Sequence, residues 1–536
     1  MLRNKSYHYY LTITIAISIA VYSIIIYFLP SFNTDDYEIF GEISKKDSPF
    51  FNVDLLQHYF LNSRPLSYLF FKLYYTLWGL NSVGMKMSGL LIHLGLMVVF
   101  FRLIVNISRF MKINPNYKIA LFITLIFSLF PDNSIWIYEI NNQTELLLIF
   151  FYLLAISFYL QYLMEERQKE AYLFFYILCY FLSILSKQQS LHLPVLMLFI
   201  TYFVKNNLER ERYNHALLTN FVGIAILIVI SLLNYSLLNY HLSLIDLLKK
   251  PVAALGILIN SFIPVFTEHL YYSILFSDNN LWYIILSILL VCIILFAFIK
   301  KYGLKNVSLF LAGYIIILYP RIYTGFSRRI NTIIIFWCLL LIFIAFQKFS
   351  SGRIKNWFMT IYTTIILLGS SINFIYSHQK FEKSMQQTAS LNKFIELNKE
   401  IDTFYIACSF MQYLNPYELY FYTNNSFGKD TRIKALPITC FQISPIMNSN
   451  SNKQIIFVKQ VEKKIVVDVP SFNYVLDQDK FNEMHGHFYL SLKLKKPRGY
   501  SRIEITIPDN SFTQNYSVIY YTGAMWKLVD YLESAE

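Results

Sequence analysis

Long runs of apolar residues recur along this chain of 536 residues, and they limit the possible fold more than any other feature. A helix of about 20 apolar residues crosses the hydrocarbon layer of a bilayer, which is roughly 30 Å thick. The chain is 56% hydrophobic, more than is usual for a soluble domain. The sequence therefore predicts a mainly α-helical, polytopic membrane protein. We expect eleven transmembrane helices, near 9–30, 87–107, 119–131, 144–163, 171–186, 191–204, 216–238, 281–299, 306–320, 330–347 and 356–376.

Two further apolar segments, 65–80 and 251–276, are interrupted by polar residues and prolines. The first begins with Pro65 and carries Lys72, and the second is broken by Pro264 and by Glu268-His269. We interpret both segments as helices that lie in, or dip into, the outer membrane interface.

The basic residues indicate the orientation of these helices. With the N-terminus in the cytoplasm, every short cytoplasmic loop carries Lys or Arg, which is the bias that sets membrane topology. Counting only one of the two interrupted segments as a span would place every later basic loop outside. The loops also explain the net charge of +13, so the charge does not point to nucleic acid. We expect eleven spans, a cytoplasmic N-terminus and an extracytoplasmic C-terminus.

The composition changes after residue 376. A polar helix is expected at about 377–400, followed by short runs such as Leu490–Leu494 and Arg502–Ile507 in which apolar and polar residues alternate. Alternation with period two is typical of half-buried strands. We therefore predict two domains, a membrane domain at 1–376 and an extracytoplasmic, β-rich (α+β) soluble domain at 377–536.

Polar residues gather at the predicted outer ends of the spans. The first outer loop, 31–86, opens with Asp35 and Asp36, two adjacent carboxylates at the membrane surface. Ionisable residues near hydrocarbon are costly and usually pair, line a wet cavity or take part in chemistry. The other candidate residues in this set are Arg64, Glu139, Glu145, Lys187, His269, Arg328 and Arg329. Their common sidedness predicts one outer-face site.

These residue types fit group transfer from a lipid phosphate. A desolvated carboxylate beside a second one should have a raised or split pKa, which suits a general base acting on an acceptor hydroxyl. Arg and Lys can hold a phosphate that approaches sideways from the bilayer. For glycosyl transfer, a single carboxylate base and direct displacement would invert the anomeric centre.

Structural roles explain the same residues in part. Asp35 and Asp36 could cap a helix, and Arg64 could precede a helix that has Pro65 at its first position. Lys187 could extend along the span towards water. His93, inside a span, is interpreted as bonded to a neighbouring helix.

In its order of short motifs the chain resembles the GT-C fold membrane glycosyltransferases, in particular the protein O-mannosyltransferases and related bacterial enzymes. The motifs are Asp35-Asp36-Tyr37, Arg64-Pro65-Leu66 through Trp78-Gly79, Glu145, Ser186-Lys187-Gln188-Gln189, and Arg328. The chain departs from the family pattern in three places. It has Asp-Asp where Asp-Glu is frequent, Gln188 where an acid follows Ser-Lys, and Ile140-Asn141 where the family has an arginine.

The resemblance implies a sugar donor on a polyprenyl phosphate and transfer on the outer (periplasmic or lumenal) face. Asp35 would be the base, and Asp36 and Glu145 would orient the acceptor or bind a divalent cation. The substrate-binding candidates are Arg64, Glu139, Lys187, His269, Arg328 and Arg329. The acceptor would be a glycan, a lipid or a protein, and we expect an integral protein of a bacterial inner (plasma) membrane.

Two other classes of protein share parts of this pattern. A transporter or flippase of lipid-linked glycans would place charged residues within its spans, where this chain has few ionisable residues apart from His93. An O-antigen-type polymerase or ligase would have its main outer loop between later spans, whereas the long loop here follows the first.

Overall fold

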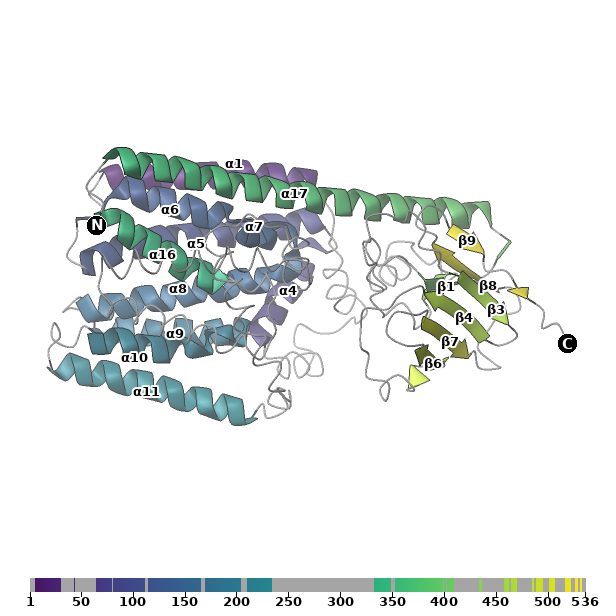
Figure 1. The fold of residues 1–536 in the computed structure, drawn as a ribbon. Coiled ribbons are helices and arrows are strands. Elements are labelled where there is room, and N and C mark those ends of the chain that lie inside the picture. The colour runs from purple at the N-terminus through teal and green to yellow at the C-terminus, as the bar shows by residue number, and fades with distance from the viewer. Residues whose placement is uncertain are drawn as a thin grey trace. The chain divides into compact units, whose positions relative to one another are not determined.

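A computed structural model gives the fold (Figure 1). It describes residues 5–29, 43, 64–79, 81–110, 114–164, 169–203, 210–233, 332–348, 352–398, 400 and 401, and strand segments between 403 and 532. The chain divides into two compact units, one made of 1–31 and 47–375 and the other of 32–46 and 376–536.

The first unit is built from helices that pack side by side (Figure 1). α5 packs against α1, α6 and α8, while α8 also packs against α9, and α10 packs against α11. The helices are α1 (Lys5–Phe28), α4 (Pro65–Trp78), α5 (Ser82–Phe110), α6 (Tyr117–Leu129), α7 (Pro131–Tyr138), η1 (Ile140–Asn142), α8 (Gln143–Met164), α9 (Lys169–Ser186), η2 (Gln188–His192), α10 (Leu193–Phe203), α11 (Arg210–Leu233), α16 (Thr332–Lys348) and α17 (Gly352–Leu397). α17 continues into the second unit.

Within the described residues, four helices are long and apolar enough to cross a membrane. They are Ser6–Phe28, Ser82–Phe110, Ile140–Met164 and Met359–Gln379. Shorter apolar helices cover Tyr117–Leu129, Glu170–Ser186 and Gln189–Tyr202. Helices occupy every predicted span that falls in the described part of the chain, whereas 281–299, 306–320 and the interrupted segment 251–276 lie outside it.

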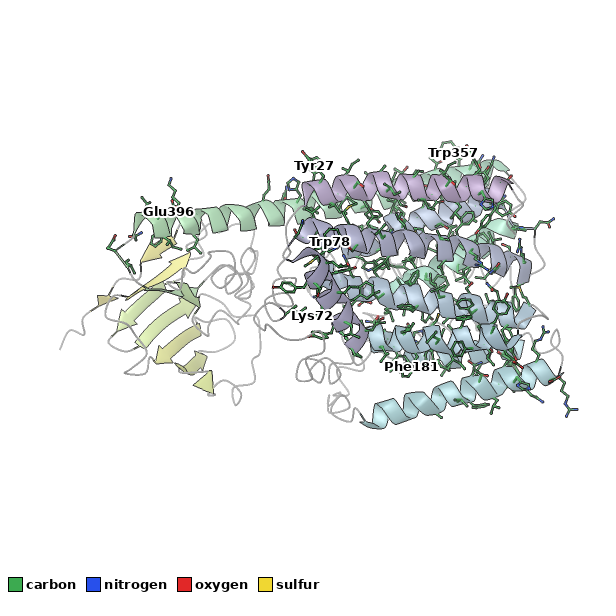
Figure 2. All side chains as sticks on the ribbon, turned by 180° about the vertical axis from the view of Figure 1, so that it is seen from behind. Tyr27, Lys72, Trp78, Phe181, Trp357 and Glu396 are labelled. Carbon is green, nitrogen blue, oxygen red and sulfur yellow. The ribbon has the colours of Figure 1, made fainter. Side chains whose placement is uncertain are left out.

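Large apolar side chains point away from these helices (Figure 2). Tyr27 and Trp357 are 78% and 70% exposed, and Phe181 of α9 also faces outward. Such a surface suits contact with lipid, since hydrocarbon tails solvate apolar side chains as well as a protein core does.

Local sequence signals explain several helix ends. Pro65 is the first residue of α4, where its missing N–H is not needed. α4 ends at Gly79, whose φ of 57° suits glycine and whose N–H bonds to the Tyr75 carbonyl at 2.8 Å. The Asn116 side chain caps α6 by accepting from the N–H groups of Lys118 and Ile119.

Buried polar bonds connect the helices inside the bundle. His93 of α5 contacts Ser128 of α6 at 2.9 Å, which confirms the interpretation of this histidine as bonded to a neighbouring helix. In α11 the Asn220 amide donates to the Tyr159 hydroxyl of α8 at 2.7 Å and accepts from the Tyr176 hydroxyl of α9 at 2.8 Å. A polar group in an apolar bundle is satisfied in this way by a partner on another helix.

The strands of the second unit form two sheets. The order is β2-β1-β8-β9 in one and β10-β3-β4-β7-β6-β5 in the other. The alternating runs at 490–494 and 502–507 lie largely in β6 and β7, which pair antiparallel with Leu492 opposite Ile503. The strands are β1 (Thr403–Cys408), β2 (Ile433–Ala435), β3 (Phe457–Val461), β4 (Lys464–Val469), β5 (Met484–His485), β6 (Phe488–Leu494), β7 (Ser501–Thr506), β8 (Tyr516–Tyr521), β9 (Trp526–Leu528) and β10 (Tyr531–Leu532).

Replacing Asn220 tests how α11 is attached to α8 and α9. We expect Asn220→Ala to lower the free energy of unfolding by about 1 kcal/mol, because two interhelical bonds of roughly 0.6 kcal/mol each are lost. The measurement is equilibrium denaturation in detergent micelles. The matched control is Thr219→Ala, since among the described residues the Thr219 hydroxyl bonds to the His215 carbonyl of its own helix and to no other helix. Equal effects of the two substitutions would contradict this role for Asn220.

Candidate functional site

The structure describes four of the nine predicted site residues. Arg64, Glu139, Glu145 and Lys187 belong to the described part of the chain, at or near helix ends. The other five, Asp35, Asp36, His269, Arg328 and Arg329, lie outside the described residues.

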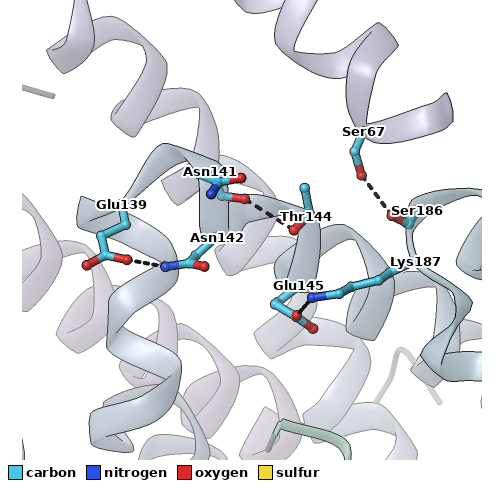
Figure 3. Close-up of polar contacts among 8 residues, drawn as sticks. All are labelled: Ser67, Glu139, Asn141, Asn142, Thr144, Glu145, Ser186 and Lys187. Carbon is cyan, nitrogen blue, oxygen red and sulfur yellow. Dashed lines mark hydrogen bonds and ion pairs between the residues drawn. The ribbon is translucent and has the colours of Figure 1, made fainter. Parts of the chain in front are cut away.

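Glu145 and Lys187, which are 42 residues apart in the chain, form an ion pair (Figure 3). Glu145 lies in the first turn of α8, and Lys187 directly follows the last residue of α9. Because α8 and α9 pack antiparallel along much of their length, the start of one helix meets the end of the other. The Lys187 ammonium reaches the Oε1 atom of Glu145.

The pair is almost fully enclosed. The exposed fraction of the Glu145 side chain is 1%, and that of Lys187 is 14%. Two charges removed from water stabilise each other only when their mutual geometry is good. The N-terminal turn of α8 also favours a carboxylate, because the helix dipole is positive there. The position of Lys187 beside this carboxylate replaces the simpler interpretation of a lysine that extends along its span towards water.

The second carboxylate oxygen of Glu145 is unsatisfied within the described part of the chain. The Oε2 atom is buried and has no hydrogen-bond partner among the described residues. A buried carboxylate oxygen without a donor is costly, and a bound water or ion or a catalytic role would explain it. A hydroxyl or a cation is the kind of group that would satisfy it.

α4 is attached to the same end of the bundle by a serine. The Ser67 hydroxyl donates to the carbonyl of Ser186 at 2.9 Å, next to Lys187 in the chain (Figure 3). Arg64 immediately precedes α4 and is half-exposed, and its side chain does not cap the helix. The Ser67 bond therefore brings the first turn of α4, and Arg64 with it, to the end of α9.

Glu139 has a different environment. It precedes η1, between α7 and α8, and its carboxylate accepts from the Asn142 amide (Figure 3). The Asn142 N–H also bonds to the Glu139 carbonyl at 3.1 Å, and the Thr144 hydroxyl bonds to the Asn141 carbonyl at 3.1 Å. These bonds hold the turn that leads into Glu145. Glu139 thus has a contact that supports the position of Glu145.

The sequence did not predict Ser67 as part of this region. A serine within an apolar segment has no distinguishing pattern, because its partner is a backbone carbonyl that any residue at position 186 would supply. Pro65 predicted where the helix begins, but it did not indicate that this helix would contact the end of α9.

The described residues hold no group of three or more His, Cys, Asp or Glu side chains arranged to bind a metal. The arrangement they do show is a lysine and a carboxylate with one unbonded oxygen, next to an arginine-bearing helix end. Chemically, this set can bind a ligand that carries both an anionic group and hydroxyls.

Comparisons with family models, with curated proteins and with solved structures find no match to this chain. The resemblance to GT-C glycosyltransferases stays a prediction that rests on the motifs.

The ion pair can be tested with a double-mutant cycle. We expect Lys187→Met to lower the free energy of unfolding by about 3 kcal/mol, because Glu145 would be left as an uncompensated buried charge. Glu145→Gln together with Lys187→Met should recover much of this loss. The measurement is denaturation of the purified protein in detergent.

A control for this cycle is the pair of Glu211 and His215, which are 86% and 61% exposed and 4.0 Å apart. Glu211→Gln should change stability little, because solvent screens exposed pairs. Additive effects of the Glu145 and Lys187 substitutions would show that the two charges do not interact.

Proposed function

We propose that this protein is a membrane glycosyltransferase that moves a sugar from a polyprenyl-phosphate donor to an acceptor hydroxyl on the outer face of the membrane, with inversion and with Asp35 as general base. The observation that carries the proposal is the meeting of Glu145 and Lys187 at one end of an apolar helix bundle. These residues come from two of the motifs that resemble the GT-C family, and a single site requires them to be close.

The donor phosphate is assigned to the cationic residues. Lys187 is partly accessible, and Arg64 lies at the end of the helix that Ser67 attaches beside it. A phosphate would compete with Glu145 for the Lys187 ammonium, so donor binding would release the Glu145 carboxylate. The released carboxylate could then bind acceptor hydroxyls or a divalent cation. Arg328, Arg329 and His269 are proposed to complete the donor site.

Asp35 is assigned as the base from the charge distribution of the loops and from its position after the first span, rather than from contacts in the structure. Asp35 and Asp36 follow the first span, and the positive-inside rule places them on the same face as Glu145 and Lys187. A carboxylate that takes the acceptor proton while the phosphate departs needs no covalent intermediate. Asp36 is proposed to orient the acceptor.

The finer topology is part of the same proposal. We infer eleven spans in the inner (plasma) membrane of a bacterium, with the N-terminus in the cytoplasm. Residues 377–536 would form a β-rich extracytoplasmic domain, which the strands β1–β10 support. The exposed aromatic surface of the helices and the four long apolar helices support membrane insertion.

Replacing Asp35 tests the general base. We expect Asp35→Asn to abolish sugar transfer, because an amide cannot accept the proton of the acceptor hydroxyl, while expression and membrane insertion persist. The assay supplies labelled polyprenyl-phosphate sugars to membranes and follows which glycoconjugate gains label. Asp54→Asn, in the same predicted loop, is the control and should retain transfer. Full activity of the Asp35 variant would remove this residue from the mechanism.

Replacing the cations tests the phosphate site. Lys187→Ala and Arg328→Ala should raise the KM for the donor more than they change the KM for the acceptor, since both residues are assigned to the donor phosphate. Lys187→Arg should keep part of the donor affinity, because it retains the charge. Lys300→Ala, in a predicted cytoplasmic loop, is the control. Unchanged donor kinetics in both Ala variants would refute the assignment.

The same assay distinguishes the other classes. If membranes with and without the protein label the same glycoconjugates, but lipid-linked sugars differ in their distribution between the leaflets, the protein is a transporter instead. Growth in the length of a glycan chain, rather than addition of one sugar, would indicate a polymerase.

A further inference from the structure

Four buried polar side chains near the start of α8 have atoms that no described residue satisfies. They are the Nδ1 atom of His93, the Oδ1 atom of Asn133, the Nε1 atom of Trp136 and both amide atoms of Gln143. The exposed fraction of each side chain is 1% or less. They come from α5, α7 and α8, and none of them belongs to the pair of Glu145 and Lys187.

The contacts of these residues place them around one turn of α5. The rings of His93 and Trp136 contact each other with centroids 6.2 Å apart. Gly89 lies one turn from His93 on the same face of α5, and a Cβ atom there would come within 2.2 Å of the Gln143 Nε2 atom. Asn133 lies one turn from Trp136 on α7, and its amide donates to the Phe127 carbonyl at 2.7 Å. Phe127 in turn contacts the Trp136 ring.

The unsatisfied atoms define what could bind among them. The Trp136 N–H only donates, the Asn133 oxygen only accepts, and the Gln143 amide does both. His93 has its other nitrogen on the Ser128 hydroxyl at 2.9 Å, so its Nδ1 atom donates or accepts according to the tautomer. A ligand must therefore donate and accept hydrogen bonds at the same time.

The size of the space and the lack of charged side chains among these four residues further limit which ligand could bind. None of the four side chains is an acid or a permanent cation, so the site offers no charge that would compensate a buried ion. Gln143 lies directly against Gly89, which leaves no room for a sugar ring at that point. Water is the smallest molecule with two donors and two acceptors, and buried water typically makes about three bonds to groups of this kind.

We propose that His93, Asn133, Trp136 and Gln143 line a binding site for ordered water enclosed between α5, α7 and α8. Each unsatisfied group would otherwise carry the full desolvation penalty of a buried polar atom. Because Gln143 is in the first turn of α8, the bound water fixes the same turn that carries Glu145. The site is independent of the proposed glycosyl transfer, and its test does not measure activity.

Gln143→Met tests the site because it removes both amide atoms while nearly keeping the shape. If water is bound, the variant loses hydrogen bonds, and we expect the Tm in detergent to fall by about 2 °C. If the amide is instead dry and unsatisfied, an apolar replacement should stabilise the protein, so the Tm should rise. The matched control is Gln161→Met, on the same helix, because Gln161 has a protein partner, the Ser157 hydroxyl at 3.4 Å. Its Tm should change less than that of the Gln143 variant.

Radiolytic labelling in ¹⁸O water gives a second readout on the unmodified protein. Bound water next to a buried side chain supplies the hydroxyl radical, so Trp136 and His93 should gain ¹⁸O despite their burial. Phe100, which is equally buried but packs against the rings of Phe127 and Phe336, should not. A Tm for Gln143→Met that is unchanged or higher, or the absence of label at both Trp136 and His93, would overturn the proposal.

Discussion

The ion pair of Glu145 and Lys187 is the interaction on which the organisation of this end of the bundle depends. Both charges are held away from water, so each one requires the other, and the ends of α8 and α9 must stay together. Neighbouring contacts help to hold the ends of α8 and α9 in the same positions. Asn142 and Glu139 fix the turn before α8, and Ser67 attaches α4 to the last residue of α9. A ligand that bound either charge would have to replace what its partner supplies.

Polar bonds, rather than apolar packing alone, give this helix bundle a defined arrangement. In a membrane, apolar side chains gain little by leaving lipid for protein, so packing and interhelical hydrogen bonds determine which helices are neighbours. Asn220 illustrates this, because it bonds to tyrosines from two different helices. Arg212 of α11 also bonds to a neighbouring helix, at the other end of α8, where its guanidinium donates to the Leu163 carbonyl at 3.0 Å. The predicted topology places Arg212 in a cytoplasmic loop, between the spans at 191–204 and 216–238, yet its side chain is buried and satisfies a helix end.

The sequence predicted where helices lie better than what they contact. Apolar runs and Pro65 located α5, α8 and α4, because these signals are local. The common sidedness of Glu145 and Lys187 predicted that they share one site, but their direct contact could not be predicted, since periodicity identifies a face of a helix but not its neighbour. Gln143 shows the limit clearly. In the sequence it is one of several polar residues near the end of a span. In the structure it is buried because it packs against Gly89, and the space beside that glycine forms only where the two helices meet.

The attachment of α1 has a consequence for the loop that follows it. Among the described residues, three side-chain bonds hold this helix to α5 and α6: Ser18 and Tyr22 bond to Ser128, and the Lys86 ammonium donates to the Leu29 carbonyl at 2.6 Å. Lengthening a connection adds only slowly to its closure entropy, so insertions after Leu29 would oppose this attachment of α1 only weakly. The position of α1 in the bundle is therefore set by bonds from its own side chains and from the residue that directly follows it, and a longer connection to α4 would disturb it little.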